Sequence, residues 1–260
     1  MRTLAMMALA VGCSSSSAPP APEHAPASMS TAPAPLTLVY VPRRVGDRFH
    51  DVQHARYDLV EGGVHVVEVR DVECDREVRA TDGAAVTSEA SHYTTFHFEH
   101  TQDGRVSVAP ALDGMAYLVT RRGDGLEIAR DDGAPLGAEE RTMVEHDHDD
   151  VKRPSGVSPY LAGRTWEVGR EVTLDDAEQR GFFFQPAVGT ASMTLTSVTP
   201  ERAHFATHNH RRFDDGVEAD VTGTMVIDRA TGRLVQQIAA WTFTGAWVGH
   251  AELTTEFSER

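Results

Sequence analysis

The chain has 260 residues, of which 40% are hydrophobic, and its formal net charge is −15 at pH 7. This length suits one large domain or two small ones. A surface with so much negative charge repels phosphate backbones, so the composition argues against nucleic acid as a partner.

The first twelve residues have the pattern of a secretory signal peptide. Arg2 is their only charged side chain, a mainly apolar run follows it, and the small residue Gly12 ends the segment. The run is shorter than the roughly 20 apolar residues that a membrane span needs. We therefore expect residues 1–12 to be removed from the mature protein.

The segment Leu9–Cys13 resembles the lipobox of bacterial lipoproteins. The resemblance implies that Cys13 carries acyl chains such as palmitate, becomes the mature N-terminus and is held in a membrane. Ser14 follows, and the family's sorting rule then favours an outer-membrane lipoprotein that faces the periplasm or the exterior. An ordinary cleaved signal is the alternative. If Cys13 is acylated, Cys74 has no partner, so neither a disulfide framework nor a cysteine-based zinc site can form.

Residues 13–36 predict a disordered linker. They contain six prolines and mostly small side chains, which cannot build a core. A proline-rich segment of this kind is semi-extended and can hold a domain away from a membrane. We expect the folded domain to span residues 37–260.

The folded part is punctuated by turn residues. Asp-Gly pairs, which strongly favour hairpin turns, occur at residues 82–83, 103–104, 113–114, 124–125, 132–133 and 215–216. Gly62-Gly63 and Thr231-Gly232 predict two more turns. Between the turns, apolar and polar residues alternate, as they do around Phe96 and Phe98 and along 251–257. The sequence therefore predicts a mainly β fold of antiparallel hairpins with one buried face.

One segment has helical periodicity instead, and it predicts one short helix near 136–150. Four apolar residues share roughly one face of that helix: Leu136, Met143, Val144 and Val151. We interpret the acidic run Glu145–Asp150 as a solvated helix end. Weak cation binding by its carboxylates and pH sensing by its two histidines are the alternatives. Residues 154–163 are predicted to form a loop.

The helix and the loop divide the folded part into two stretches. Each opens on a Val-Gly pair, Val45-Gly46 in the first and Val168-Gly169 in the second. Two similar halves, 37–135 and 162–260, are one interpretation of this pattern. The halves can form one continuous sheet or two stacked sheets.

The order of these elements resembles a group of uncharacterised secreted bacterial lipoproteins. The shared features are a Val-Gly-Asp strand at 45–47, a turn at Asp132–Pro135, an acidic helix, a second Val-Gly strand and a late hairpin at Ile227–Arg233. The late hairpin is also similar to one in the lipoprotein carriers, whose curved sheet shields an acyl chain. The resemblance implies a curved sheet and brings no catalytic residue with it.

Histidine is abundant, with 13 copies. His204, His208 and His210 fall on one face if their segment is a strand. His208 and His210 are the weak metal candidates, because about 7 Å between their Cα atoms lets both rings reach one ion. The cations Arg211 and Arg212 beside them repel a metal ion. We therefore favour a solvent-facing strand and expect no metal and no other cofactor.

No enzyme motif is present. The chain lacks Gly-x-Ser-x-Gly, a phosphate-binding loop that ends in Lys-Ser/Thr, and His-Glu-x-x-His. We therefore expect no enzymatic activity. A hydrolase with an unrecognised site is the more distant alternative.

Aromatic residues offer the remaining functional candidates. Trp241, Phe243 and Trp247 are expected on one face of a strand, and three consecutive phenylalanines stand at 182–184. Core packing is the simpler explanation, and the other is a lining for an apolar ligand. We expect a membrane-tethered, non-enzymatic protein with a binding or envelope-structural role. A carrier with a lipophilic molecule in an apolar cavity is the alternative.

Overall fold

The structure of the chain is a computed structural model that describes residues 34–148, 151, 158–175, 178–179, 188–213 and 216–260. The predicted signal peptide, the proposed lipidation site Cys13 and most of the linker lie outside these residues, as do the three phenylalanines at 182–184. In the described part of the chain, no helix combines the length and the apolar character that crossing a membrane requires.

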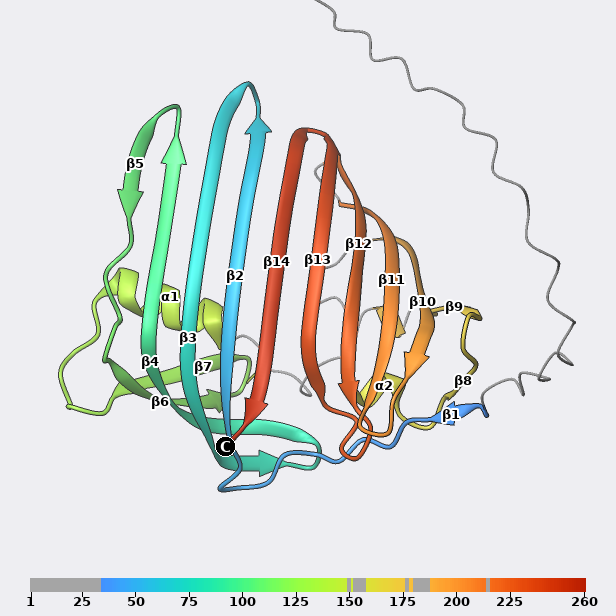
Figure 1. The fold of residues 1–260 in the computed structure, drawn as a ribbon. Helices are drawn as coiled ribbons and strands as arrows, with labels where there is room; N and C mark the ends of the chain where they lie inside the picture. Colours follow the sequence, from blue (N-terminus) through green and yellow to red (C-terminus); the bar gives the residue numbers. More distant parts are fainter. Residues whose placement is uncertain (1–33, 149–150, 152–157, 176–177, 180–187, 214–215) are drawn as a thin grey trace, which may run out of the picture. The chain divides into compact units, whose positions relative to one another are not determined.

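One large antiparallel sheet dominates the fold (Figure 1). It has twelve strands, in the order β7-β6-β4-β3-β2-β14-β13-β12-β11-β10-β9, with β5 paired beside β4. A small second sheet pairs β1 with β8. The predicted mainly β, antiparallel fold is confirmed. The main sheet is continuous, because β2 and β14, from opposite ends of the folded part, pair in its middle.

The first strands in chain order are β1 (Leu36–Thr37), β2 (Arg48–Glu61), β3 (Val64–Asp82), β4 (Ala85–Gln102), β5 (Arg105–Val108), β6 (Ala116–Arg122) and β7 (Gly125–Arg130). After two short helices the remaining strands are β8 (Thr165–Trp166), β9 (Glu171–Thr173), β10 (Val188–Val198), β11 (Arg202–Arg212), β12 (Val217–Asp228), β13 (Leu234–Gly245) and β14 (Trp247–Glu259).

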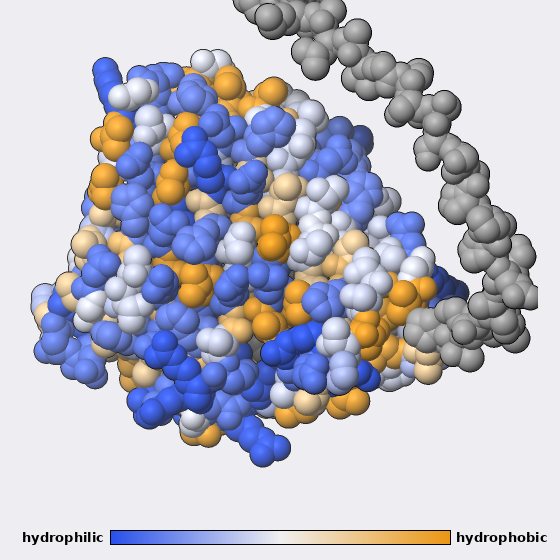
Figure 2. Space-filling model, in the orientation of Figure 1, coloured by the Kyte–Doolittle hydropathy of each residue, from blue (hydrophilic) through white to orange (hydrophobic). Residues whose placement is uncertain are grey.

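Period-two alternation gives the sheet an apolar inner face and a polar outer face. On β12, for example, Val217, Ala219 and Val221 are buried, whereas Glu218 and Asp220 between them are not. Alternate side chains of a strand point to opposite faces, so each strand contributes to both surfaces. The side of the molecule shown in Figure 2 is largely hydrophilic, with apolar side chains in small groups.

Most of the predicted turns join neighbouring strands. At Asp103-Gly104 both residues have positive φ angles, 47° and 77°, as a tight hairpin turn requires. Several Asp-Gly predictions are wrong in detail. The turn between β3 and β4 is Gly83-Ala84, because Asp82 still belongs to β3. The pair at 113–114 precedes β6 without joining two paired strands, and residue 215 lies outside the described residues. The turn between β6 and β7 is Gly123-Asp124, because Gly125 already begins β7. The pair at 132–133 leads into a helix and does not join two strands.

The predicted helix is confirmed as α1 (Ala138–Asp147). Its start is fixed by the carboxylate of Glu140, which accepts a hydrogen bond from the backbone N–H of Gly137. Val144 is fully buried, as the helical pattern predicts. Val151 is fully buried too, but it and Leu136 lie outside the helix that was expected to include them. A second helix of one turn, α2 (Ser158–Leu161), lies within the segment predicted as a loop.

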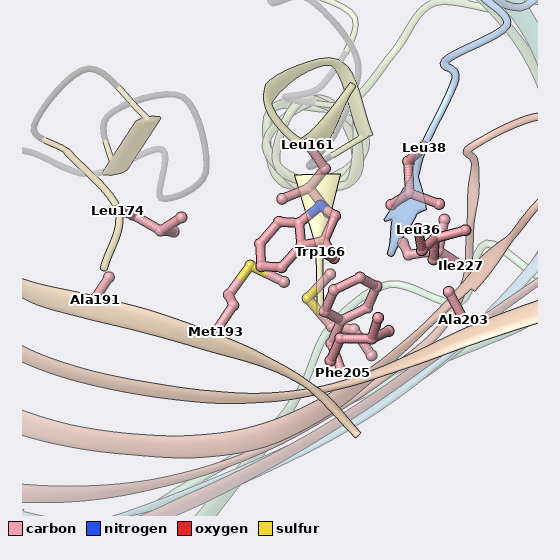
Figure 3. Packing of buried hydrophobic residues seen from close by; sticks show 12 residues of the cluster. Leu36, Leu38, Leu161, Trp166, Leu174, Ala191, Met193, Ala203, Phe205 and Ile227 are labelled. Carbon is pink, nitrogen blue, oxygen red and sulfur yellow. The ribbon is translucent and has the colours of Figure 1, made fainter. Parts of the chain in front are cut away.

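The inner face of the sheet carries two apolar clusters with a second layer of chain over them. The N-terminal cluster lies on β3, β4, β6 and β7 and includes Val144 of α1. The C-terminal cluster lies on β9 to β13 and includes residues of β1, β8 and α2. Figure 3 shows Trp166 and Leu161 of this second layer above the curved strands, with the Trp166 ring centroid 4.9 Å from that of Phe205.

Candidate functional site

A third apolar group, the central cluster, lies on β2 and β12 to β14 and contains the predicted aromatic residues. Trp241 and Phe243 on β13 stack with their ring centroids 5.9 Å apart. Trp247 lies 6.2 Å from Phe243, centroid to centroid. The three rings share one face, but they occupy two strands and not one, because the chain turns after Gly245 and Trp247 begins β14.

The central cluster is built differently from its two neighbours. Its members all come from the sheet, apart from Phe213 just after β11. Trp166 in the C-terminal cluster is completely buried, whereas Trp241 and Trp247 are only half-buried. Among the described residues, the central cluster therefore includes no side chain from a second layer.

Small side chains stand beside two of the rings of the central cluster. Ala251 lies directly opposite Trp241 in the pairing of β13 with β14. Ala219 lies opposite Phe243 in the pairing of β12 with β13. Directly opposite residues have Cβ atoms only about 5 Å apart, so each of these two rings stands beside a methyl group. The result is an apolar surface in which aromatic rings are flanked by small side chains.

A buried cation borders this surface. Arg211 is on the inner face of β11, is only 6% exposed, and its guanidinium carbon lies 5.5 Å from the ring centroid of Trp241. Burial lowers the pKa of Arg211 to about 10, so the group stays charged at neutral pH. Asn209, two residues earlier on the same face, is also buried. The inner face of β11 is thus apolar around Phe205 and polar toward Arg211.

The histidines predicted as weak metal candidates lie on the outer face. His208 and His210 alternate with the buried Asn209, and Nδ1 of His210 lies 2.9 Å from a carboxylate oxygen of Asp220. Within the described ranges, no group of three or more ligating side chains is placed to hold a metal ion. We expected Arg211 and Arg212 to repel a metal ion at these histidines. This expectation is wrong for Arg211, because Arg211 faces the opposite side of the sheet from the histidines.

The acidic run Glu145–Asp150 is only partly the solvated helix end that we predicted: His146 is exposed, and residues 149 and 150 lie outside the described part of the chain, but the middle of the run faces a buried charge network. Asp147, the last residue of α1, and the next residue His148 are both buried. Arg76 on β3 binds three carboxylates, with nitrogen–oxygen distances of 3.0 Å to Asp51, 2.8 Å to Glu89 and 3.1 Å to Asp147. The last carboxylate of α1 thus faces this arginine.

Two further side chains complete the network. The hydroxyl of Tyr93 donates a 2.8 Å hydrogen bond to Asp147, and Arg70 also binds that carboxylate. Burial opposes the charge on Asp147, but Arg76 and Arg70 outweigh it and lower the pKa to about 2. Each carboxylate of the network is thus held by an arginine. We interpret the network as the junction between α1 and the sheet.

His148 is buried against the same groups. Burial, together with the charge of Arg76, lowers its pKa to about 3, so the ring is neutral at pH 7. Its Nδ1 lies 3.1 Å from the carbonyl oxygen of Val144. Sequence analysis missed this site because alternating acids and histidines in a chain look the same whether they face water or an arginine on another strand.

Cys74 is fully buried on β3, inside the N-terminal cluster. Burial raises the pKa of its thiol, and the nearby carboxylates of Asp51 and Asp147 act in the same direction. Removal from water is the larger of these two causes.

Comparisons with known proteins give little for this chain. No protein-family model matches it, and no curated protein matches its sequence. Among solved structures, one of lipovitellin, described as showing lipid–protein interactions, has a similar arrangement at a TM-score of 0.38 and 6% sequence identity. That match covers 82% of this chain and 25% of the lipovitellin chain.

Proposed function

We propose that this chain is a membrane-tethered binding protein that carries a lipophilic molecule against the central cluster. The proposal assigns a ligand-lining role to Trp241, Phe243 and Trp247 and requires no catalytic step. It keeps the lipid anchor at Cys13 and the outer-membrane location that the N-terminal sequence implies. The observation that carries the proposal is the row of three aromatic rings, two of them half-buried tryptophans, on the inner face of the sheet.

The physical reason for this proposal is that apolar surface exposed to water is unfavourable in free energy. A sheet with one apolar face has to cover that face, and the two flanking clusters are covered by α1 and by β1, β8 and α2. Apolar area removed from water contributes about 25 cal/mol per Å², or roughly 0.8 kcal/mol for each methylene group. A flexible hydrocarbon chain that lies along the rings gains this free energy along its whole length.

The shape of the surface favours a small lipophilic molecule over a flat macromolecular partner. The surface lies on the same inner face of the sheet as the C-terminal cluster, which Figure 3 shows on the concave side of the strands. Ala219 and Ala251 place small methyl groups beside its rings. Ligand sites are typically concave and lined by aromatic and aliphatic side chains, with a few polar groups at one end. A tether at Cys13 would hold the domain close to a membrane, which is a source of such molecules.

The first prediction tests the ligand-lining role. The full chain carrying Cys13→Ser, so that it stays in solution, should bind a naphthalene-type fluorescent probe saturably and with about one probe per chain. Trp241→Ala and Trp247→Ala should each weaken that binding without unfolding the domain, because both side chains are half-buried. Probe fluorescence and thermal unfolding measure the two effects.

Ile238→Ala is the matched control. Ile238 lies on the same strand as Trp241 but points to the outer face, where it is 44% exposed. Its removal should leave probe binding unchanged. A central cluster closed by the rest of the chain predicts the opposite result, with no saturable binding and a loss of about 3–5 kcal/mol of stability in each tryptophan variant. That outcome would remove the carrier function.

A further inference from the structure

A polar cleft, here called the arginine cleft, lies where the segment between β1 and β2 passes the end of β14 (Figure 1). Its volume is about 450 Å³. Its walls carry four arginines and two carboxylates: Arg44, Arg48, Arg233, Arg260, Asp47 and Glu259. Positive side chains therefore outnumber negative ones here, although the whole chain has a net charge of −15. The cleft is a local positive site in an acidic protein.

The two carboxylates of the arginine cleft are already bound by arginines. Arg233 lies 3.0 Å from a carboxylate oxygen of Asp47 and 3.0 Å from one of Glu259. Arg43 lies 3.2 Å from the same oxygen of Glu259. Only 12% of the Arg43 side chain and 13% of the Arg233 side chain are exposed, so both cations are held in place. Because these carboxylates are paired, they offer little repulsion to an anion that enters the cleft.

Two exposed arginines stand side by side at the end of the pairing between β2 and β14. The backbone N–H of Arg260 donates a 3.1 Å hydrogen bond to the carbonyl oxygen of Arg48. Like charges that face each other across two strands are unfavourable. Each arginine binds one carboxylate of β3, Glu77 for Arg48 and Asp75 for Arg260, and the two side chains remain 66% and 54% exposed. A guanidinium has five N–H donors, so donors are left over for a second anion.

Arg44 is the exposed cation of the cleft that lacks a compensating charge. In the part of the chain that the structure describes, its guanidinium makes neither a hydrogen bond nor an ion pair. Its backbone is fixed, because its N–H donates to the carboxylate of Asp47 at 2.9 Å and its carbonyl accepts from the N–H of Asp47 at 3.0 Å. The N–H of Gly46 in the same turn donates to the carbonyl of Val78. An unpaired cation is thus presented on a fixed turn beside other arginines.

We propose that the arginine cleft binds a phosphate group carried by a small polar molecule, and that Arg44, Arg48 and Arg260 donate hydrogen bonds to its oxygens. Arginine suits this anion, because its planar fork of N–H donors matches phosphate oxygens. The cleft is larger than one phosphate group, which leaves room for an attached polar group such as glycerol or a sugar. This inference goes beyond the proposed carrier function and is independent of it, since the cleft and the central cluster share no residue.

The test compares glycerol 3-phosphate with glycerol, which lacks the charge, by titration calorimetry on the Cys13→Ser chain at low ionic strength. We expect saturable binding of about one glycerol 3-phosphate per chain and no binding of glycerol. Arg44→Gln should weaken the binding at least about tenfold, the usual effect of losing one charge-assisted hydrogen bond. Its thermal unfolding should match that of the parent, because the Arg44 side chain is exposed and unpaired among the described residues.

Arg212→Gln is the matched control. It removes the same charge from the outer face of β11, where the side chain is 69% exposed, and should bind the probe as the parent does. Equal weakening in the two variants would show that overall charge attracts the probe, and it would refute the site.

A second arm identifies the source of the phosphate group. It uses vesicles of phosphatidylcholine and phosphatidic acid in equal parts, with pure phosphatidylcholine vesicles as the reference. Binding to the mixed vesicles alone, lost in Arg44→Gln and kept in Arg212→Gln, supports the site and assigns the phosphate to a membrane lipid. Binding of glycerol 3-phosphate supports a molecule free in solution. If neither glycerol 3-phosphate nor the mixed vesicles bind, the inference is refuted and the carrier function stands.

Discussion

At the scale of single residues, the buried charge network is the main departure from a simple β-sheet core. Arg76 is fully buried with three carboxylates, and two of them, Asp51 and Glu89, come from separate strands of the sheet. A buried ion pair recovers little net stability, because desolvation offsets most of the attraction. Breaking one is costly, however, since the remaining charge is left buried. The network therefore specifies where α1 attaches more than how strongly it does so.

His148 gives this network a measurable pH dependence. The folded ring has a pKa of about 3, whereas an unfolded histidine titrates near 6.5. Between these values the unfolded state binds more protons, so the free energy of unfolding should fall by about 1.4 kcal/mol for each pH unit as the pH is lowered. Denaturant unfolding at several pH values from 6.5 to 4.5 should show this slope, and the variant His148→Gln should lose it.

The difference between the two proteins is the quantity to measure. Burial raises the pKa of Asp51, which changes stability in the opposite sense over part of this range. That contribution is present in both proteins and cancels in the comparison. Identical slopes in the parent and in His148→Gln would show that the ring is not held neutral.

At the scale of elements, the segment between β1 and β2 packs against the turn between β12 and β13. Its Val41 N–H donates a 2.7 Å hydrogen bond to the carbonyl of Thr231, in the turn between β12 and β13. Arg233 donates to the carbonyls of Val41 and Pro42 and pairs with Asp47 at 3.0 Å. A cleft of about 450 Å³ with polar walls lies beside this junction. The hairpin turn at 231–232 thus contacts a segment that is distant from it in sequence.

Gly232 is the position where this contact is most restrictive. Its φ is +68°, and a Cβ added to it would lie 2.1 Å from the carbonyl oxygen of Val39. Gly232→Ala should therefore destabilise the protein in two ways: it strains the backbone, and it displaces the segment between β1 and β2 that contacts this turn. Gly83→Ala is the matched control, since Gly83 has φ +60° with no atom within 4 Å of the added Cβ.

Gly83→Ala should lower the free energy of unfolding by roughly 1–2 kcal/mol, because alanine is strained in a left-handed backbone conformation. Gly232→Ala should cost at least about 1 kcal/mol more, as measured by chemical denaturation. An equal loss of unfolding free energy in the two variants would show that the segment between β1 and β2 moves aside at little cost and does not restrain the sheet.

At the scale of the whole molecule, the two faces of the sheet differ in chemistry. Histidine–carboxylate pairs recur on the outer face, as between His50 and Asp75 and between His54 and Asp71, each at 2.8 Å. The inner face carries the apolar clusters. This asymmetry keeps the polar side toward water and leaves the apolar side for covering elements and, under our proposal, a ligand. With a net charge of −15, the surface itself has little attraction for anionic membranes, so membrane attachment would depend on the proposed lipid anchor.

The anchor leads to the last prediction. Cys13→Ala should abolish palmitate labelling and release the protein from the membrane fraction of a host able to process lipoproteins. Fractionation and labelling of the parent and the variant side by side measure both effects. Absence of label from the parent chain in such a host would contradict the lipoprotein assignment and leave the folded domain unaffected.

The sequence by itself determined the class of the fold and most of its local structure. Strand alternation and hairpin turns such as Asp103-Gly104 depend on neighbouring residues, and so does the helical face that includes Val144. It also indicated that Trp241, Phe243 and Trp247 lie on one face, although it placed all three on a single strand and missed the turn after Gly245.

Only the tertiary structure decided which groups meet across the sheet. Arg76 and Asp147 are 71 residues apart, and their contact depends on where α1 lies on the sheet. The same holds for the orientation of Arg211: its neighbour Arg212 has the same chemistry, and only burial of one face of β11 separates a buried cation from a solvated one. Local patterns specify the faces of an element. Which face is covered, and by what, depends on contacts distant in sequence.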